Sequence, residues 1–216
     1  MTYSKQTFTL NQKLTSAQVN QLETNIQDHV HGSGSMSDIP GIQKIATGSS
    51  TAVATLDITQ TDSAKWKHYL LVIHNVAPAT DAVSLFLRTS TDGGSTFAAD
   101  AVYSLAGTDV DNNVPTLTTR GGAGATALTL GLAASHGNAA NEIGCGEIWI
   151  LNPHDANTRT RILWQYSWID TGGMYHTDQS SGHHGANENT NAFRLLFGSG
   201  NIASIKWTLY GVPGEA

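Results

Sequence analysis

The N-terminal residues carry apolar side chains at helical spacing. Val19, Leu22, Ile26 and His29 follow one another at steps of three, four and three residues, which is the a/d pattern of a short seam. A capping box at residues 15–18 favours a helix that begins just before them. So narrow an apolar stripe needs a partner to pack on. That partner is either the chain's own domain or the same helix of other copies, with Val19, Leu22 and Ile26 as the seam of a coiled coil.

The pattern changes after a segment rich in glycine and serine. Residues 32–37 read Gly-Ser-Gly-Ser-Met-Ser, which is the composition of a flexible hinge, and the Pro-Gly pair at 40–41 marks a turn. Beyond it the helical spacing gives way to alternation of apolar and polar residues. We therefore expect two parts: residues 1–34, an anchor with its helix and hinge, and residues 35–216, a single folded domain.

Short alternating segments separated by Gly, Asn and Asp fill the second part. In one of them Val83, Leu85 and Leu87 fall on the same face, as in a half-buried strand. The segments of this kind are 51–59, 67–75, 83–88, 101–105, 116–120, 126–130, 147–151, 158–169, 191–197 and 203–212. Some eight to ten strands with turn signals between them predict a mainly β fold, a single β-sandwich that is most simply a jelly roll.

Composition narrows the classes of protein that fit. Thr (26), Ser (18), Gly (22) and Asn (14) are abundant among the 216 residues, while only 13% are charged. Thr, Asn and Gly are poor helix formers, which excludes an all-helical fold. The tryptophans fall in or beside predicted strands, where such residues usually belong to a core or a subunit contact.

The charge balance indicates which binding partners to expect, and the cysteine content indicates the cellular compartment in which the chain folds. Eleven Lys and Arg face seventeen Asp and Glu, with no basic cluster, so neither nucleic acid nor an anionic membrane is expected as a partner. Apolar runs such as 70–73 are too short for membrane insertion. The single cysteine, Cys145, excludes an intrachain disulfide, and the N-terminus lacks the layout of a secretion signal. A hydroxyl-rich surface without export signals suits a virion protein that is assembled in a cytoplasm and released by lysis.

Three stretches resemble virion proteins of tailed bacteriophages. Residues 8–32, with Leu-Thr-Ser-Ala-Gln-Val-Asn at 14–20 and Asp-His-Val-His-Gly at 28–32, are similar to the attachment ends of tail-fibre-like proteins. Residues 69–97 and 197–212 resemble sandwich domains of such proteins. The resemblance implies a homotrimeric fibre or head-spike component that is assembled in the host bacterial cytoplasm, joined to other virion proteins through its N-terminal segment. It does not distinguish a tail from a head location.

His29 and His31 form the most pointed local signal for a metal. In an extended segment, side chains two residues apart face the same way, so three copies around an axis would bring six imidazoles together. That set suits a divalent transition metal in octahedral geometry, and some phage fibres use a His-x-His pair in this way. The alternative is a polar helix end at which a histidine complements the helix dipole. No other cofactor is expected.

The longest polar stretch supplies the candidate receptor contacts. Residues 175–189 read as a loop, and its aromatic, imidazole, amide and carboxylate groups suit a host surface polysaccharide. The candidates are Tyr175, His184, Asn187, Glu188 and Asn189. The alternative is an ordinary mobile surface loop. If the loop does bind a receptor, we expect it at the end of the domain distal to the N-terminal anchor.

Two classes of function remain open. The first is a trimeric fibre or spike that binds a host glycan. The second is a capsid or tail decoration or connector subunit with no receptor-binding role. The sequence contains no nucleophile elbow, no P-loop and no His-Glu-x-x-His motif, so we expect no enzymatic activity.

Overall fold

The computed structural model describes residues 41–112, 117–131 and 136–214. Within these residues the chain forms twelve strands and no helix. The strands are β1 (Gln43–Val53), β2 (Leu56–Ile58), β3 (His68–Pro78), β4 (Leu85–Ser90), β5 (Tyr103–Asp111), β6 (Thr118–Ala125), β7 (Leu128–Leu130), β8 (Gly144–Leu151), β9 (Arg161–Ile169), β10 (Tyr175–His184), β11 (Ala192–Phe197) and β12 (Ile202–Val212). Residues 41–216 form one compact unit. The predicted helix, with the rest of residues 1–34, lies outside the described residues.

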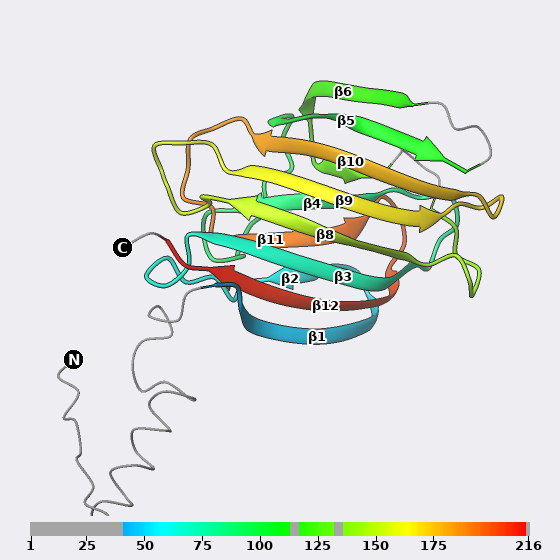
Figure 1. Cartoon of the computed structure of the whole chain (residues 1–216), viewed down its shortest axis with the longest axis horizontal. Helices are drawn as coiled ribbons and strands as arrows, with labels where there is room; N and C mark the ends of the chain where they lie inside the picture. The colour runs from blue at the N-terminus through cyan, green and yellow to red at the C-terminus, as the bar shows by residue number, and fades with distance from the viewer. Residues whose placement is uncertain (1–40, 113–116, 132–135, 215–216) are drawn as a thin grey trace, which may run out of the picture. The chain divides into compact units, whose positions relative to one another are not determined.

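The strands form two antiparallel sheets that face each other across the core (Figure 1). The larger sheet has the order β1-β12-β3-β8-β9-β10-β5-β6, and the smaller one has the order β2-β11-β4-β7. Four pairings are nested along the chain, β1 with β12, β2 with β11, β3 with β8 and β4 with β7, and successive pairs alternate between the two sheets. The hairpins β5–β6 and β9–β10 extend the larger sheet. The predicted β-sandwich is confirmed.

Alternation along the strands decides which side chains enter the core. In β9, Ile162, Trp164, Tyr166 and Trp168 are buried, while the residues between them face outward. Trp149 likewise lies on the outer face of β8, because its neighbours on either side point inward. The other four tryptophans are at most 9% exposed, so the prediction that strand tryptophans form the core is confirmed for them.

Strand β10 contradicts the prediction of a long polar loop. Residues 175–184 pair on one side with β9 and on the other with β5. Both faces of this strand are polar: Thr177 and Gln179 face outward, while His176, Asp178 and Ser180 are buried. Hydrophobic alternation is therefore absent from β10, although its backbone is fully paired.

The two ends of the sandwich can be told apart by one row of paired residues. Val212, His68, Leu151, Arg161, His183 and Ser104 follow one another across the larger sheet. This row marks the end at which Gln43 pairs with Gly211, here called the proximal end (left in Figure 1). The opposite, distal end holds the turn between β9 and β10. Within the described residues, no helix is long and apolar enough to cross a membrane.

Candidate functional site

The five predicted receptor contacts do not lie together. Tyr175 begins β10 at the distal end and His184 ends it at the proximal end, so at about 3.3 Å per residue the two lie roughly 30 Å apart. Tyr175 is 49% exposed, and its N–H donates to Asn112 Oδ1 at 3.0 Å. Tyr175 is therefore separated from the other four candidates.

The other four candidates lie at the proximal end. His184 follows His183, which belongs to the row that marks this end, and residues 187–189 lie in the loop between β10 and β11. The N-terminal segment lies outside the described residues, so a receptor site distal to the anchor stays a prediction. Strand β10 runs from the distal to the proximal end, so the loop that follows it lies at the same end of the larger sheet as Gln43.

The two candidate asparagines, Asn187 and Asn189, are bonded within the chain. Asn187 Nδ2 donates to the backbone oxygen of Asn157 at 2.9 Å. The hydroxyl of Tyr69 accepts the N–H of Asp62 at 2.7 Å and is hydrogen-bonded to His154 Nε2 at 2.8 Å. His154 Nδ1 then donates to Asn189 Oδ1 at 3.2 Å. These bonds fix the β10–β11 loop against the β8–β9 loop.

His184 is buried, whereas the side chain of Glu188 is partly exposed. His184 is 7% exposed, and the edge of its ring meets the ring of Tyr103 with centroids 5.3 Å apart. Its Nδ1 lies 2.9 Å from Glu188 Oε1, and the Glu188 side chain is 21% exposed. Of these two residues, Glu188 is therefore the one that can meet a ligand.

Glu188 forms one wall of a polar pocket of about 360 Å³ at the proximal end. The opposite walls come from the end of β4 and from the segment that leads to β5. The pocket is lined by Thr89, Ser90, Thr91, Thr96, Phe97, Ala98, Ala99, Asp100 and Glu188. Hydroxyls, two carboxylates and one aromatic ring thus surround a space of the size that a small polar ligand needs.

A buried tyrosine holds the walls of the pocket together. The Tyr103 hydroxyl accepts the N–H of Thr89 at 2.8 Å and donates to the backbone oxygen of Ala98 at 3.2 Å. The N–H of Ala98 in turn donates to the oxygen of Thr89 at 2.9 Å. Burial raises the pKa of Tyr103, so the hydroxyl keeps its proton and both bonds. The pocket is therefore formed before any ligand arrives.

The turn beside the pocket is fixed by Asp92. Its carboxylate accepts bonds from the Thr96 hydroxyl at 2.6 Å, the Thr96 N–H at 2.9 Å and the Ser90 hydroxyl at 2.7 Å, and these bonds lower its pKa to about 2. Gly93 and Gly94 have φ of 73° and 92°, in the left-handed region that glycine adopts without steric cost. The turn does not close a hairpin, however, because β4 and β5 lie in different sheets.

The aromatic ring of the pocket is covered on one face. The guanidinium carbon of Arg194 lies 4.0 Å from the centre of the Phe97 ring, and Arg194 makes two bonds to Asp57, at 2.6 and 2.7 Å. The ring is thus held in place by a cation–π contact. Phe97 adds an apolar wall to the pocket, beside its hydroxyls and carboxylates.

A second hollow, of about 530 Å³, lies on the outer face of the larger sheet. Small residues of β5 and β10 form its floor, and Leu151, Arg161 and Leu163 border it. Leu163 is 40% exposed. The lining is mostly apolar, so this hollow suits a polyhydroxylated ligand less well than the proximal pocket does.

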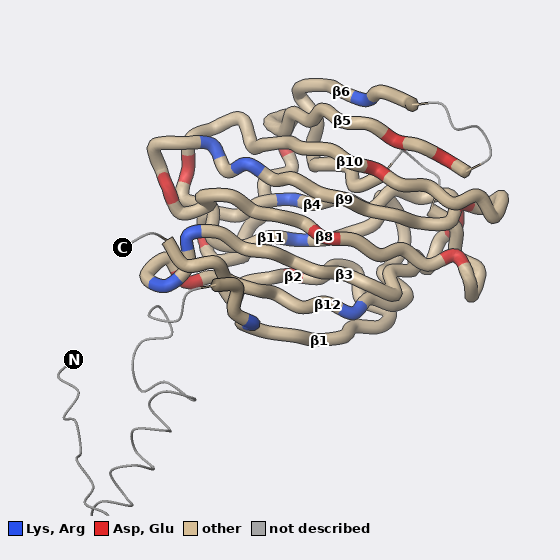
Figure 2. Tube along the Cα trace, in the orientation of Figure 1, with Lys and Arg blue, Asp and Glu red and all other residues tan. Residues whose placement is uncertain are grey.

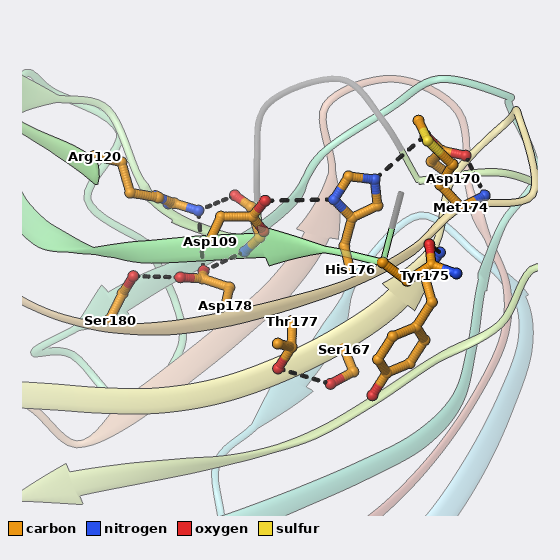
Figure 3. A network of polar contacts seen from close by, with 12 residues as sticks. Asp109, Arg120, Ser167, Asp170, Met174, Tyr175, His176, Thr177, Asp178 and Ser180 are labelled. Carbon is orange, nitrogen blue, oxygen red and sulfur yellow. Dashed lines mark hydrogen bonds and ion pairs between the residues drawn. The ribbon is translucent and has the colours of Figure 1, made fainter. Parts of the chain in front are cut away.

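A buried polar network lies between β10, β5 and β6 (Figure 3). Asp178 is 0% exposed, and its Oδ2 accepts bonds from Trp164 Nε1 and Gly131 N at 2.8 Å each and from Arg120 Nη1 at 2.9 Å. The hydroxyl of Ser180 donates to the other carboxylate oxygen. Asp178 is thus a fully bonded buried carboxylate whose charge is balanced by one arginine.

His176 continues the network towards the distal end. Its Nδ1 lies 3.3 Å from Asp109 Oδ1, its Nε2 lies 3.3 Å from Asp170 Oδ2, and its ring stacks on Trp168 with centroids 4.9 Å apart. Burial raises the pKa of Asp109, and the bond to His176 opposes that rise. For Asp170, burial acts to raise the pKa, but the hydrogen bonds that the carboxylate accepts, among them one from the N–H of Met174, act more strongly in the other direction. The net effect is a lowered pKa.

This network is buried, so we assign it to the stability of the fold and not to ligand binding. The side chains of Asp109, Arg120, His176 and Asp178 are at most 11% exposed. Among the described residues, no group of three or more His, Cys, Asp and Glu side chains is placed to hold a metal ion. Sequence reasoning missed the network because each member looks like a polar surface residue until its strand partners are known.

Two predicted sites cannot be located. The trimer seam of Val19, Leu22 and Ile26 and the metal pair His29 and His31 lie outside the described residues. The metal at a trimer axis therefore stays a prediction.

Comparison of the chain with protein-family models finds no match, and a search of curated proteins finds none. What the proximal pocket binds is therefore inferred from the residues that line it. Of these, only Glu188 was among the predicted contacts.

Proposed function

We propose that this chain is a virion structural protein, a homotrimeric fibre or spike component of the tailed-phage type, and that its sandwich binds a host surface glycan in the proximal pocket. The observation that carries the proposal is the lining of this pocket, in which hydroxyls, the Asp100 and Glu188 carboxylates and the Phe97 ring converge. Residues 1–34 join the protein to other virion proteins and supply the trimer seam.

The lining matches what a sugar presents to a protein. Carboxylate oxygens accept bonds from sugar hydroxyls, the threonine and serine hydroxyls both donate and accept, and an apolar ring packs against C–H groups. The bonds of Tyr103 and Asp92 hold the pocket open in advance, which lowers the entropy lost on binding. One such pocket binds weakly, and three on a trimer would raise the apparent affinity through avidity.

The strand order supports a jelly roll with two inserted hairpins. Without β5–β6 and β9–β10, the sheets reduce to β1-β12-β3-β8 and β2-β11-β4-β7, which is one long hairpin rolled into two four-stranded sheets. The jelly roll is an architecture of viral capsid domains and of lectins. Fold alone does not specify function, so this support is secondary to the pocket.

The pocket is tested by replacing its two carboxylates in the full chain. Asp100→Asn with Glu188→Gln keeps both side-chain shapes and leaves an oxygen that can still accept from His184. We expect at least a tenfold loss of binding to host-derived polysaccharide, about 1.4 kcal/mol, with little change in melting temperature. Glu147→Gln, on the exposed outer face of β8, is the matched control. Unchanged binding in the double variant would exclude this pocket as the receptor site.

One observation favours the alternative, a decoration or connector subunit. Asn187 and Asn189 are bonded to the neighbouring loop and are not free to meet a ligand. If the wild-type chain binds no host polysaccharide while virions that lack it lose integrity, the decoration role replaces the glycan-binding one.

A further inference from the structure

Strand β6 leaves one edge of the larger sheet open. Residues Thr118–Ala125 pair with β5 on one side only (top of Figure 1). Within the described residues, the backbone of β6 makes no bond to any other segment. Its outward N–H and C=O groups therefore face solvent, as a template on which another strand can pair.

This edge has little of the usual protection against pairing. The one charged residue of β6 is Arg120, in the blue part of this strand in Figure 2. Its guanidinium lies 2.9 Å from the buried Asp178 (Figure 3). The rest of the strand is threonine, glycine and alanine, and its bulge lies near its end, at Gly124. At the opposite edge, by contrast, β1 carries Lys44 and a bulge next to it. Proteins normally block an open edge with an outward lysine, a proline, a bulge or a charge that points inward. Of these, the run from Thr118 to Ala123 has only the inward charge, and Arg120 is neutralised there by Asp178.

The faces of β6 are also largely uncovered. Thr118, Thr119 and residues 121–124 are exposed, although side chains alternate between the two faces of a strand. Leu117, directly before the strand, is 59% exposed, more than any other large apolar residue described. A strand that buries so little gains little stability from its own domain. A neighbouring strand would supply the missing contacts.

We propose that β6 pairs antiparallel with β6 of a second copy, joining two larger sheets into one. A strand edge is recognised by an extended backbone, and a twofold contact places the same small residues opposite one another without steric conflict. Charge is compatible with a second copy here: the chain carries a net charge of −6, and two copies repel each other least where the surfaces that meet hold no carboxylates. The outward face of β6, with Thr119, Gly121 and Ala123, offers such a surface.

Cross-linking through a single cysteine tests the twofold pairing. A side chain added at Gly122 meets no atom within 4 Å, so Gly122→Cys in a Cys145→Ser background should fold normally. We expect a short bis-maleimide to convert this full-length variant into covalent dimers. The wild-type chain, whose exposed Cys145 lies on β8, is the matched control and should not be linked. If covalent dimers form only when a second cysteine is introduced on β1, then β6 pairs with β1 of the next copy, and the twofold pairing is wrong.

Blocking the edge gives an independent test. Thr119→Lys places a charge on the outer face of β6, and Gln165→Lys places the same charge in the same row of the sheet, three strands inward. By light scattering of the full chain, we expect at least a twofold lower mass for Thr119→Lys than for the wild type and for Gln165→Lys. All three should melt cooperatively, which would show that the added charge blocks pairing and does not unfold the domain. Equal masses would overturn the proposal, whether the shared mass is that of a monomer or of a trimer.

Discussion

Replacing Asp178 by Asn removes one negative charge from the interior of the sandwich without changing the size of the side chain. The carboxylate oxygen that accepts from Trp164, Gly131 and Arg120 has a counterpart in the amide oxygen of asparagine, so the same three bonds can form. The Ser180 hydroxyl can rotate to accept from the new NH₂ group. The change therefore isolates the charge that balances Arg120, whose side chain is 11% exposed.

The expected loss of stability follows from this burial. Removing one partner of a buried ion pair costs about 3–5 kcal/mol, because the other charge stays without compensation. Asp109 also attracts Arg120, so we expect the lower end of that range, about 3 kcal/mol. At roughly 2–4 °C per kcal/mol for a domain of this size, the melting temperature should fall by about 6–12 °C. Asp57→Asn is the control, since its partner Arg194 is 28% exposed, and its cost should stay below about 1 kcal/mol.

The loss of stability is measured by denaturant unfolding of Asp178→Asn, of Arg120→Met and of the variant that carries both substitutions. Combining Asp178→Asn with Arg120→Met removes both charges, so the double variant should lose less stability than the two single variants together, by about 1 kcal/mol or more. Additive losses, or equal losses for Asp178→Asn and Asp57→Asn, would refute the assignment of this pair as a buried, coupled one.

Two further predictions concern buried groups. Burial raises the pKa of Asp109 above 3.8, so between the two pKa values the folded chain holds more protons than the unfolded chain and stability falls as pH rises. Asp109→Asn keeps an oxygen for His176 and has no proton to lose. Its stability relative to the wild type should rise as the pH increases from about 3 through the raised pKa of Asp109, and a constant difference in urea titrations would contradict this. Gly144→Ala places a methyl group against the Tyr166 hydroxyl and should cost about 1–3 kcal/mol. Gly122→Ala, which points into open space, should change stability by less than about 0.5 kcal/mol, and similar unfolding midpoints for the two glycine variants would refute the packing argument.

The candidate pocket shows which of its lining residues can be predicted from residue type alone and which cannot. Glu188 was predicted because it is a carboxylate in a polar stretch, and it does line the pocket. Phe97 and Asp100 lie about ninety residues earlier in the chain, and only the contact between the β4–β5 and β10–β11 segments brings them to Glu188. His184, a predicted contact, is buried instead, because the register of β10 on β5 turns it toward Tyr103.

Sequence determined the fold class because it records which face of each strand is apolar. Alternation in β4, β9 and β12 is a local property, and the structure places those apolar residues in the core. Only the tertiary structure decided that β10 is a strand and that β6 continues from the predicted segment 116–120 to Ala125. Neither alternates in hydrophobicity, since β6 is rich in glycine and β10 buries His176 and Asp178. A buried carboxylate is stable only when other segments supply its charge partner and donors, and those partners are set by strand pairing across the whole chain.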